Sequence, residues 1–198
     1  MLARLRVFIR RRLLSATREL TLQNLNEEPH IHHVSVFPDD RGSFAVPWVS
    51  KLGPIRQPAQ MNVSHSTQGV VRGMHWQAQP RAIAKYVYCT NGKVFDQVVD
   101  LRKNHPTFGK VWSFELDQSK ALYVPAHFAH GFQCLTEEAT VVYLQSGSYS
   151  PEHERTINAK GYLWPTEIKE QSEKDREAPS LFAMVAGQGR GVADEELF

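Results

Sequence analysis

The sequence predicts an all-β sandwich or barrel with short helices near its two ends. Short apolar or alternating runs recur along residues 33–145, and turn-like pieces such as Pro38–Gly42 separate them. Eight or more strands at this spacing are typical of a β-sandwich or β-barrel. No internal repeat or long linker divides this region. We therefore expect one domain over residues 31–185, a basic N-terminal extension over 1–30 and a flexible tail over 186–198.

The predicted strands are rich in β-branched and aromatic side chains, which suit a pleated and half-buried surface. In chain order they are His33–Phe37, Gly69–Trp76, Ala84–Cys89, Val94–Leu101, Val111–Leu116, Ala121–Val124, Gly131–Leu135 and Thr140–Gln145. The Asn91-Gly92 pair between two of these predicts a hairpin turn, because both residue types accept a positive φ. Helical patterns are restricted to residues 2–20 and to the polar stretch Thr166–Glu177.

Composition and charge limit the possible classes of protein. A chain of 198 residues with 41% apolar side chains is long and apolar enough for one domain with a core. Cys89 and Cys134 match neither a disulfide framework nor a zinc spacing, so we expect buried free thiols, which fit a cytoplasmic protein. Residues 1–18 hold six arginines and no acid, which leaves the remainder mildly acidic. That remainder argues against nucleic acid as the main partner.

The arginine-rich start has several possible explanations. Its longest uncharged apolar run, Val7-Phe8-Ile9, is too short for a secretory signal core or a transmembrane span. A targeting peptide, a membrane-surface helix, an appended helix and an upstream start codon all remain open.

The densest group of chemically useful residues is Val71–Gln77, followed by Lys85. A general base such as His75 beside fixed positive charge suits the removal of a proton next to a carbonyl group. Arg72 and His75 would point to opposite faces of a regular strand, because side chains alternate with a period of two. Gly73 lies between them, and we predict a β-bulge there that brings both to one side.

Other polar residues have both structural and functional explanations. Lys85 either extends outward from its strand or forms a fixed cation in a barrel mouth. Asp96 and Asp100 share a strand face with apolar residues, and burial of an unpaired acid is costly. We therefore expect Asp96 to pair with Lys85 or a histidine, and Asp100, near the strand end, to be solvated. His130 lies in a segment, Pro125–Phe132, that suggests a pocket wall.

Two residues far from this segment carry weaker signals. Tyr143 is either a core or rim residue, or a phenolic proton donor that faces His75 across a cavity. Asp175 lies in a charged run that composition alone assigns to the solvent. The nine histidines raise the possibility of a metal site, but His75 is followed by Trp76-Gln77 without a second ligand or a nearby Glu. We therefore expect no metal.

Many spaced motifs over residues 33–182 resemble the dTDP-4-dehydrorhamnose 3,5-epimerase family of cupin-fold nucleotide-sugar epimerases. The matching residues, in family order, are Val70–Gln77, Lys85, Val94–Asp96, Val99–Arg102, Pro106–Gly109, Pro125, Phe128–Phe132, Tyr143, Tyr149–Pro151, Glu154, Trp164-Pro165, Ser172 and Lys174-Asp175. The resemblance implies a metal-free jelly-roll homodimer without a redox cofactor. It also implies a nucleoside-diphosphate 4-keto-6-deoxyhexose as substrate, of the kind used in deoxysugar and surface polysaccharide biosynthesis.

The resemblance also implies residue roles. His75 is expected to remove the proton from C3 or C5 with Asp175 orienting it, Lys85 to stabilise the enolate oxygen, and Tyr143 to return a proton on the opposite face. The expected substrate-binding residues are Arg72 for the diphosphate, Arg41 for phosphate in its own or the neighbouring subunit, and Gln60, Asn62, Asp96, His130 and Tyr149 in the pocket. An acid and a base on opposite ring faces are the minimum machinery for inversion.

Three departures from the family pattern fall on the nucleotide side. Val46 replaces a frequent glutamate, Ser148 replaces an aromatic residue that stacks on the base, and the segment Ile157–Trp164 is shorter than usual. We therefore expect retained chemistry with an altered base, such as CDP, GDP or UDP. Whether one or both carbons are inverted stays open. A metal-dependent cupin enzyme with an ion at His75 and His130, and a non-catalytic carbohydrate-binding cupin, are the alternatives.

Overall fold

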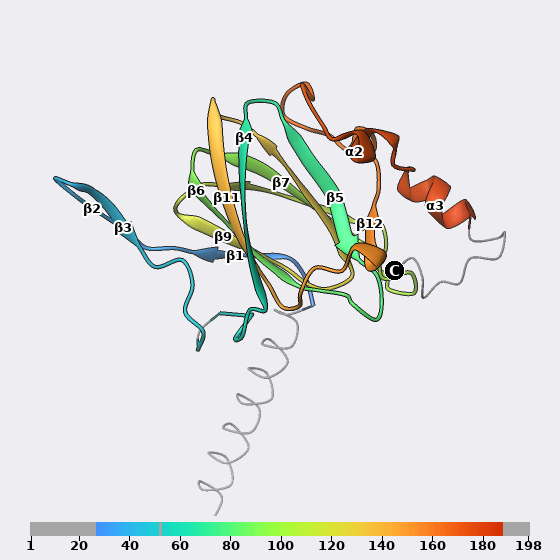
Figure 1. Ribbon diagram of the computed structural model, residues 1–198, viewed down its shortest axis with the longest axis horizontal. Helices are drawn as coiled ribbons and strands as arrows, with labels where there is room; N and C mark the ends of the chain where they lie inside the picture. Colours follow the sequence, from blue (N-terminus) through green and yellow to red (C-terminus); the bar gives the residue numbers. More distant parts are fainter. Residues whose placement is uncertain (1–26, 52, 188–198) are drawn as a thin grey trace, which may run out of the picture.

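Two five-stranded antiparallel sheets face each other and form the body of the protein (Figure 1). The structure is a computed structural model and describes residues 27–51 and 53–187. The first sheet contains, in spatial order, β1 (His30–His33), β9 (Lys120–Val124), β6 (Lys85–Asn91), β11 (Glu138–Gln145) and β4 (Gln60–Thr67). The second contains β12 (Glu154–Thr156), β5 (Val71–Gln77), β10 (Phe128–Cys134), β7 (Val94–Asp100) and β8 (Val111–Leu116). The predicted all-β sandwich is confirmed.

The remaining elements lie outside these two layers. A two-stranded hairpin, β2 (Val36–Asp39) and β3 (Gly42–Ala45), projects from the body, as Figure 1 shows. Short 3₁₀ turns η1 (Pro151–His153) and η2 (Ala159–Gly161) flank β12, and the helices α2 (Glu173–Glu177) and α3 (Leu181–Gly187) close the described chain. No helix within the described residues is long and apolar enough to cross a membrane.

The main core fills one end of the space between the sheets. Its buried side chains come from facing strands, for example Val87 on β6, Val98 on β7, Leu122 on β9 and Phe132 on β10. Burial of each such side chain stabilises the fold by roughly 1.5–3 kcal/mol. Both cysteines are free and lie in this core, as expected from their apolar neighbours. Apolar packing thus holds the sheets together at this end.

The single strand predicted over His33–Phe37 is wrong, because it straddles the break between β1 and β2, which belong to different sheets. The strands β3, β4 and β12 were not predicted, and β4 is the most instructive. Its inward side chains are polar (Gln60, Asn62, Ser64 and Ser66), whereas Met61 and Val63 alternate with them and are exposed. This reverses the usual alternation of apolar inward and polar outward side chains, because the interior here is a polar cavity. The short strands β3 and β12 lack a pattern long enough to detect.

The hairpin predicted at Asn91-Gly92 is wrong in its pairing. Gly92 has a φ of 75°, and the turn is tight. However, β6 and β7 belong to different sheets and do not pair. The turn instead carries the chain from one layer to the other. A local turn signal specifies the reversal of the chain but not which strands pair afterwards.

Of the two predicted helical stretches, one lies outside the described residues and the other is helical only in part. The pattern over residues 2–20 lies outside the described residues, as does most of the expected tail. Only Glu173–Glu177 of the predicted Thr166–Glu177 helix is α-helical. The segment before it instead follows the second sheet, where Lys169 N–H and Val71 N–H donate backbone hydrogen bonds to Gly69 and Glu170. Helix α3 was not predicted, and its Leu181 and Met184 pack against a second apolar cluster around Met74.

Candidate active site

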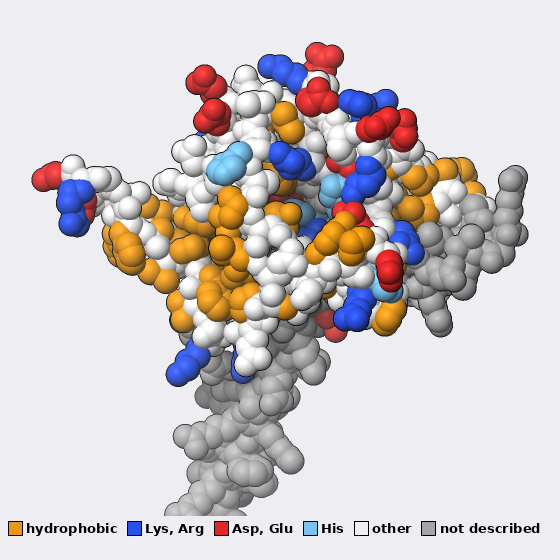
Figure 2. All heavy atoms as spheres, in the orientation of Figure 1, with side chains coloured by type: hydrophobic (Ala, Val, Ile, Leu, Met, Phe, Trp, Pro, Cys, Tyr) orange, Lys and Arg blue, Asp and Glu red, His pale blue; other side chains and the backbone are white. Residues whose placement is uncertain are grey.

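A cavity of about 1280 Å³ opens between the two sheets beside the main core, which contributes Phe132 and Ala139 to its lining. Polar side chains of β4 and β11 form one wall, and β5, β10 and the start of α2 form the other. Figure 2 shows histidine and charged side chains gathered around this hollow. Such a concave site with convergent titratable groups is where a ligand is expected to bind.

The predicted bulge in β5 is confirmed and explains how two functional side chains share one face. His130 pairs with His75 and Phe132 pairs with Arg72, so three residue steps on β5 oppose two on β10. Gly73 has a φ of 112°, and an added Cβ would lie 2.6 Å from the His130 carbonyl oxygen. Only glycine fits this position without strain. Both Arg72 and His75 consequently line the cavity.

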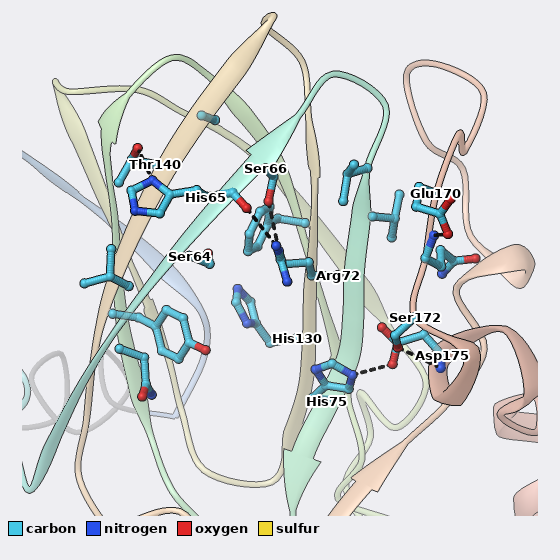
Figure 3. A pocket seen from close by; sticks show the side chains of 18 of the residues that line it. Ser64, His65, Ser66, Arg72, His75, His130, Thr140, Glu170, Ser172 and Asp175 are labelled. Atoms are coloured by element: carbon cyan, nitrogen blue, oxygen red, sulfur yellow. Dashed lines mark hydrogen bonds and ion pairs between the residues drawn. The ribbon is translucent and has the colours of Figure 1, made fainter.

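His75 is held by an acidic residue 100 positions further along the chain. Its Nε2 lies 2.6 Å from Oδ1 of Asp175, while Gly73 N–H donates to Oδ2 of the same carboxylate (Figure 3). A carboxylate can only accept, so Nε2 carries the proton and Nδ1 keeps a free lone pair. Burial would raise the pKa of Asp175, but hydrogen bonds from His75, Gly73 and Ser172 lower it overall. The pair is therefore built as an oriented base.

A buried cation lies next to this base. Lys85 is 7% exposed, and its Nζ donates to the main-chain oxygen of His75 at 3.1 Å. Burial lowers its pKa to about 8, although the charges of Asp96 and Glu154 oppose that shift. Of the two explanations for Lys85, the structure therefore supports the fixed internal cation and not the outward side chain.

Asp96 and His130 form a second buried pair at the base of the cavity. His130 Nε2 lies 2.9 Å from Oδ2 of Asp96, as the sequence led us to expect. Burial raises the pKa of Asp96 and lowers that of His130, because each loses hydration of its charged form. Asp100 behaves differently from the prediction: it is fully buried and accepts hydrogen bonds from Arg102 and Thr107.

Tyr143 faces the base from the opposite sheet. It lies on β11 between Asn62 on β4 and Val87 on β6, and it lines the cavity with His75. Burial raises its pKa, with the positive charge of Arg72 acting against that shift. The phenol therefore keeps its proton at neutral pH and is available as a donor.

The remaining predicted residues divide into two groups. Gln60, Asn62 and Tyr149 line a smaller adjoining pocket that also contains His75 and Lys85. The Gln60 side chain accepts from Tyr149 N–H at 2.8 Å and so fixes the end of this wall. Arg41 instead lies at the tip of the projecting hairpin, where it pairs with Asp39, and it does not line either cavity of its own chain.

Two charged residues that line the cavity, Glu154 and Lys174, received no role from the sequence, although both lie inside the matching motifs. Glu154 on β12 accepts hydrogen bonds from Lys174 and from the Tyr149 hydroxyl, both at 2.8 Å. A glutamate and a lysine in charged runs give no local signal beyond a solvated surface. Across residues 27–51 and 53–187, no group of three or more His, Cys, Asp or Glu side chains is arranged to hold a metal ion.

Comparison with known proteins points to one family. A family model described as dTDP-4-dehydrorhamnose 3,5-epimerase matches residues 26–182. A dTDP-4-dehydrorhamnose 3,5-epimerase from Streptomyces griseus is 40% identical over 159 residues, which cover 75% of this chain and 80% of the relative. The crystal structure of the enzyme of that name from Sulfolobus tokodaii has a TM-score of 0.74 at 38% identity and covers 78% of this chain and 90% of its own. ChmJ, a 3'-monoepimerase from Streptomyces bikiniensis in complex with dTDP-quinovose, has a TM-score of 0.73 at 32% identity, with coverages of 81% and 87%.

Proposed function

Because this chain belongs to the dTDP-4-dehydrorhamnose 3,5-epimerase family, we propose that His75, Lys85 and Tyr143 form its acid–base machinery. The protein is an epimerase with a cupin-type β-sandwich fold, and its substrate class is a nucleoside-diphosphate 4-keto-6-deoxyhexose. One observation carries the assignment of roles. The oriented base on β5 and the phenol on β11 line the same cavity from opposite sheets, with a buried cation beside them.

In the first step, Nδ1 of His75 removes the proton from a carbon next to the C4 ketone. The C–H electron pair moves into a new C=C bond, and the ketone oxygen gains negative charge as an enolate. Asp175 stabilises the imidazolium ion that forms, because its carboxylate accepts the Nε2 proton at 2.6 Å. Lys85 stabilises the enolate oxygen from a position that is already dehydrated, which strengthens the interaction.

In the second step, Tyr143 returns a proton to the same carbon from the opposite face. The enolate electrons reform the ketone, a new C–H bond forms and the configuration inverts. The phenol suits this role because burial keeps it protonated until the strongly basic enolate carbon accepts its proton. Proton transfer to and from the solvent then resets both groups.

The polar wall near β4 is the part of the cavity that suits the nucleotide. Arg72 is held by Ser66 and by the His65 carbonyl oxygen, which presents a positioned guanidinium to a diphosphate. We propose that Gln60, Asn62, His130 and Tyr149 complete the binding wall. Asp96, expected in the pocket, is fully buried and lines neither cavity, so its contribution is to orient the His130 imidazole. The named relatives act on dTDP-sugars, so dTDP is the reference substrate. The proposed shift to CDP, GDP or UDP rests on Val46, Ser148 and the short segment Ile157–Trp164.

We propose that the protein acts as a homodimer. The hairpin and the outer face of β4 expose large apolar side chains, namely Phe37, Phe44, Val46, Met61 and Val63. Figure 2 shows apolar side chains running from the base of the hairpin onto the body. A contiguous apolar patch of this kind is characteristic of a protein interface. Pairing would also bring Arg41, at the hairpin tip, towards the cavity of the neighbouring subunit.

Deuterium exchange tests the proposed function directly. The protein is incubated with dTDP-, CDP-, GDP- and UDP-4-keto-6-deoxyhexoses in deuterated water, and label at C3 and C5 is followed by NMR. Exchange that is lost in His75→Ala supports the proposal. Label at C3, C5 or both identifies the carbons that lose a proton, and the configuration of the product counts the inverted centres. Binding without exchange for every sugar would refute it in favour of a binding module, and exchange abolished by a chelator would support the metal enzyme.

A further inference from the structure

A bridge of three side chains crosses the mouth of the cavity beside the base. Oε2 of Glu154 accepts a hydrogen bond from Nζ of Lys174 and another from the Tyr149 hydroxyl, both at 2.8 Å. Glu154 belongs to β12, Lys174 to α2 and Tyr149 to the segment after β11. One carboxylate therefore joins α2 to β12 and to the segment that precedes β12.

The bridge is connected to His75 on two sides, through Lys174 and through β12. Lys174 directly precedes Asp175, whose carboxylate orients His75 at 2.6 Å. On the other side, β12 pairs with β5, so that Thr156 lies opposite His75 and Glu154 opposite Gln77. Glu154 and Thr156 share a face of their strand because they are two residues apart. The Glu154 carboxylate thus connects the segment that carries Asp175 to β12, the strand that pairs with β5 at His75.

Helix α2 is held by contacts with other segments: Asp175 binds His75 and Gly73, Asn158 donates to the Arg176 carbonyl oxygen, and the Glu154–Lys174 pair adds a further contact. It has only five residues, and Ser172 caps its first turn by accepting from Asp175 N–H. A helix this short does not hold its position by its own hydrogen bonds. A misplacement of about 1 Å at a catalytic group is enough to lower a rate on the order of 10²-fold. The contacts that place α2 therefore matter for the base.

The bridge contributes little to overall stability. The Lys174 side chain is 49% exposed and that of Glu154 is 23% exposed. Solvent-accessible ion pairs of this kind contribute little to the free energy of unfolding, because water screens the attraction and the side chains lose conformational freedom. Glu154 nevertheless stays ionised, because hydrogen bonds from Lys174 and Tyr149 lower its pKa more than burial raises it. Because the Glu154–Lys174 pair adds little stability but lies beside His75, its role is better explained by the placement of neighbouring side chains.

We propose that Glu154 is a positioning residue for the epimerase reaction: it holds Lys174, and through it α2, so that Asp175 keeps His75 aligned in the cavity. This inference rests on the proposed function of His75 as the base. Glu154 is not assigned to proton transfer. Its effect belongs to kcat, because alignment of the base matters in the transition state and not in substrate binding.

A double-mutant cycle tests this coupling. Glu154→Gln and Lys174→Met are each expected to lower kcat for C–H exchange by roughly 10–100-fold with little change in KM. The double variant should lose no more than Glu154→Gln alone, because Lys174→Met removes one of the two contacts that the Glu154 carboxylate makes. Lys174→Arg should restore most of the rate, and Glu115→Gln, which removes the acid of a remote exposed Lys93–Glu115 pair, serves as the matched control.

A second measurement separates this inference from the proposed function. In the ligand-free protein, the proton between His75 Nε2 and Asp175 should give a downfield ¹H NMR resonance that disappears in His75→Ala. It should shift or broaden in Glu154→Gln and Lys174→Met and not in Glu115→Gln. Unchanged kcat and an unchanged resonance would overturn the inference, as would losses confined to KM that add in the double variant. No exchange in the wild type would instead refute the proposed function.

Discussion

The buried lysine makes a quantitative prediction about pH. In the proposed mechanism, Lys85 acts only when it is protonated, since the neutral amine does not stabilise an enolate by charge. Burial lowers its pKa from 10.5 to about 8. The sign follows directly: activity is present below this pKa and is lost as the pH rises through it. The plot of kcat/KM against pH reports the pKa values of the free enzyme and is therefore the relevant profile.

The size of the effect follows from the pKa. With a pKa of about 8, about 90% of the molecules carry the charged lysine at pH 7 and about 10% at pH 9. The value of kcat/KM should therefore fall about tenfold between these two pH values. Tyr143 does not interfere in this range, because burial raises its pKa above that of an ordinary tyrosine.

The assay is the initial rate of deuterium incorporation between pH 6 and pH 10. Lys85→Arg should remove the alkaline limb from whatever activity remains, because a guanidinium does not deprotonate in this range. A direct titration of the Lys85 ¹³Cε resonance, assigned by its absence in Lys85→Arg, should give the same midpoint in the ligand-free protein. A rate that stays constant to pH 10, or a resonance that titrates near 10.5, would refute this reasoning.

Three further predictions follow from the geometry. Tyr143→Phe should retain exchange of the substrate proton with solvent but lose most of the inversion, since only the acid is removed; equal loss of both in NMR would contradict this. Gly73→Ala should lower the free energy of unfolding by roughly 2–4 kcal/mol, because the new Cβ would lie 2.6 Å from the His130 carbonyl oxygen, and a denaturation curve that matches the wild type would count against it. Phe44→Asp should convert a dimer into monomers in light scattering; a wild type that is already monomeric would disprove the proposed interface.

Local patterns predicted the features that local forces determine. Alternating apolar side chains gave most strands of the sandwich, and the period-two rule at Gly73 gave the bulge. The cost of burying an unpaired acid gave the partner of Asp96. The same rule was misapplied to Asp100, because Arg102, two residues further on, supplies the bonds that make burial possible. The partner was close in sequence, but a pattern of apolar and polar residues does not predict which neighbouring side chains pair.

Long-range pairing was beyond these patterns. Asp175 contacts a residue 100 positions away, and only the family resemblance placed it near His75. The polar strand β4 escaped detection because it faces a cavity and not a core. Glu154 was quoted as part of a motif but had no assigned role, since its two partners arrive from separate segments. Contacts between residues that are distant in sequence become visible only when the three-dimensional structure is known.

The bulge in β5 also fixes the distance between two side chains that contact different parts of the proposed substrate. Arg72 and His75 are fixed relative to each other by backbone and not by flexible side chains, because Gly73 lies tightly against β10. If the guanidinium holds the diphosphate and the imidazole attacks the hexose, this spacing measures the length of the ligand between them. A sugar attached through one phosphate would fall short of the base. Selection against free sugars and sugar monophosphates would then come from chain geometry, independent of the nucleobase.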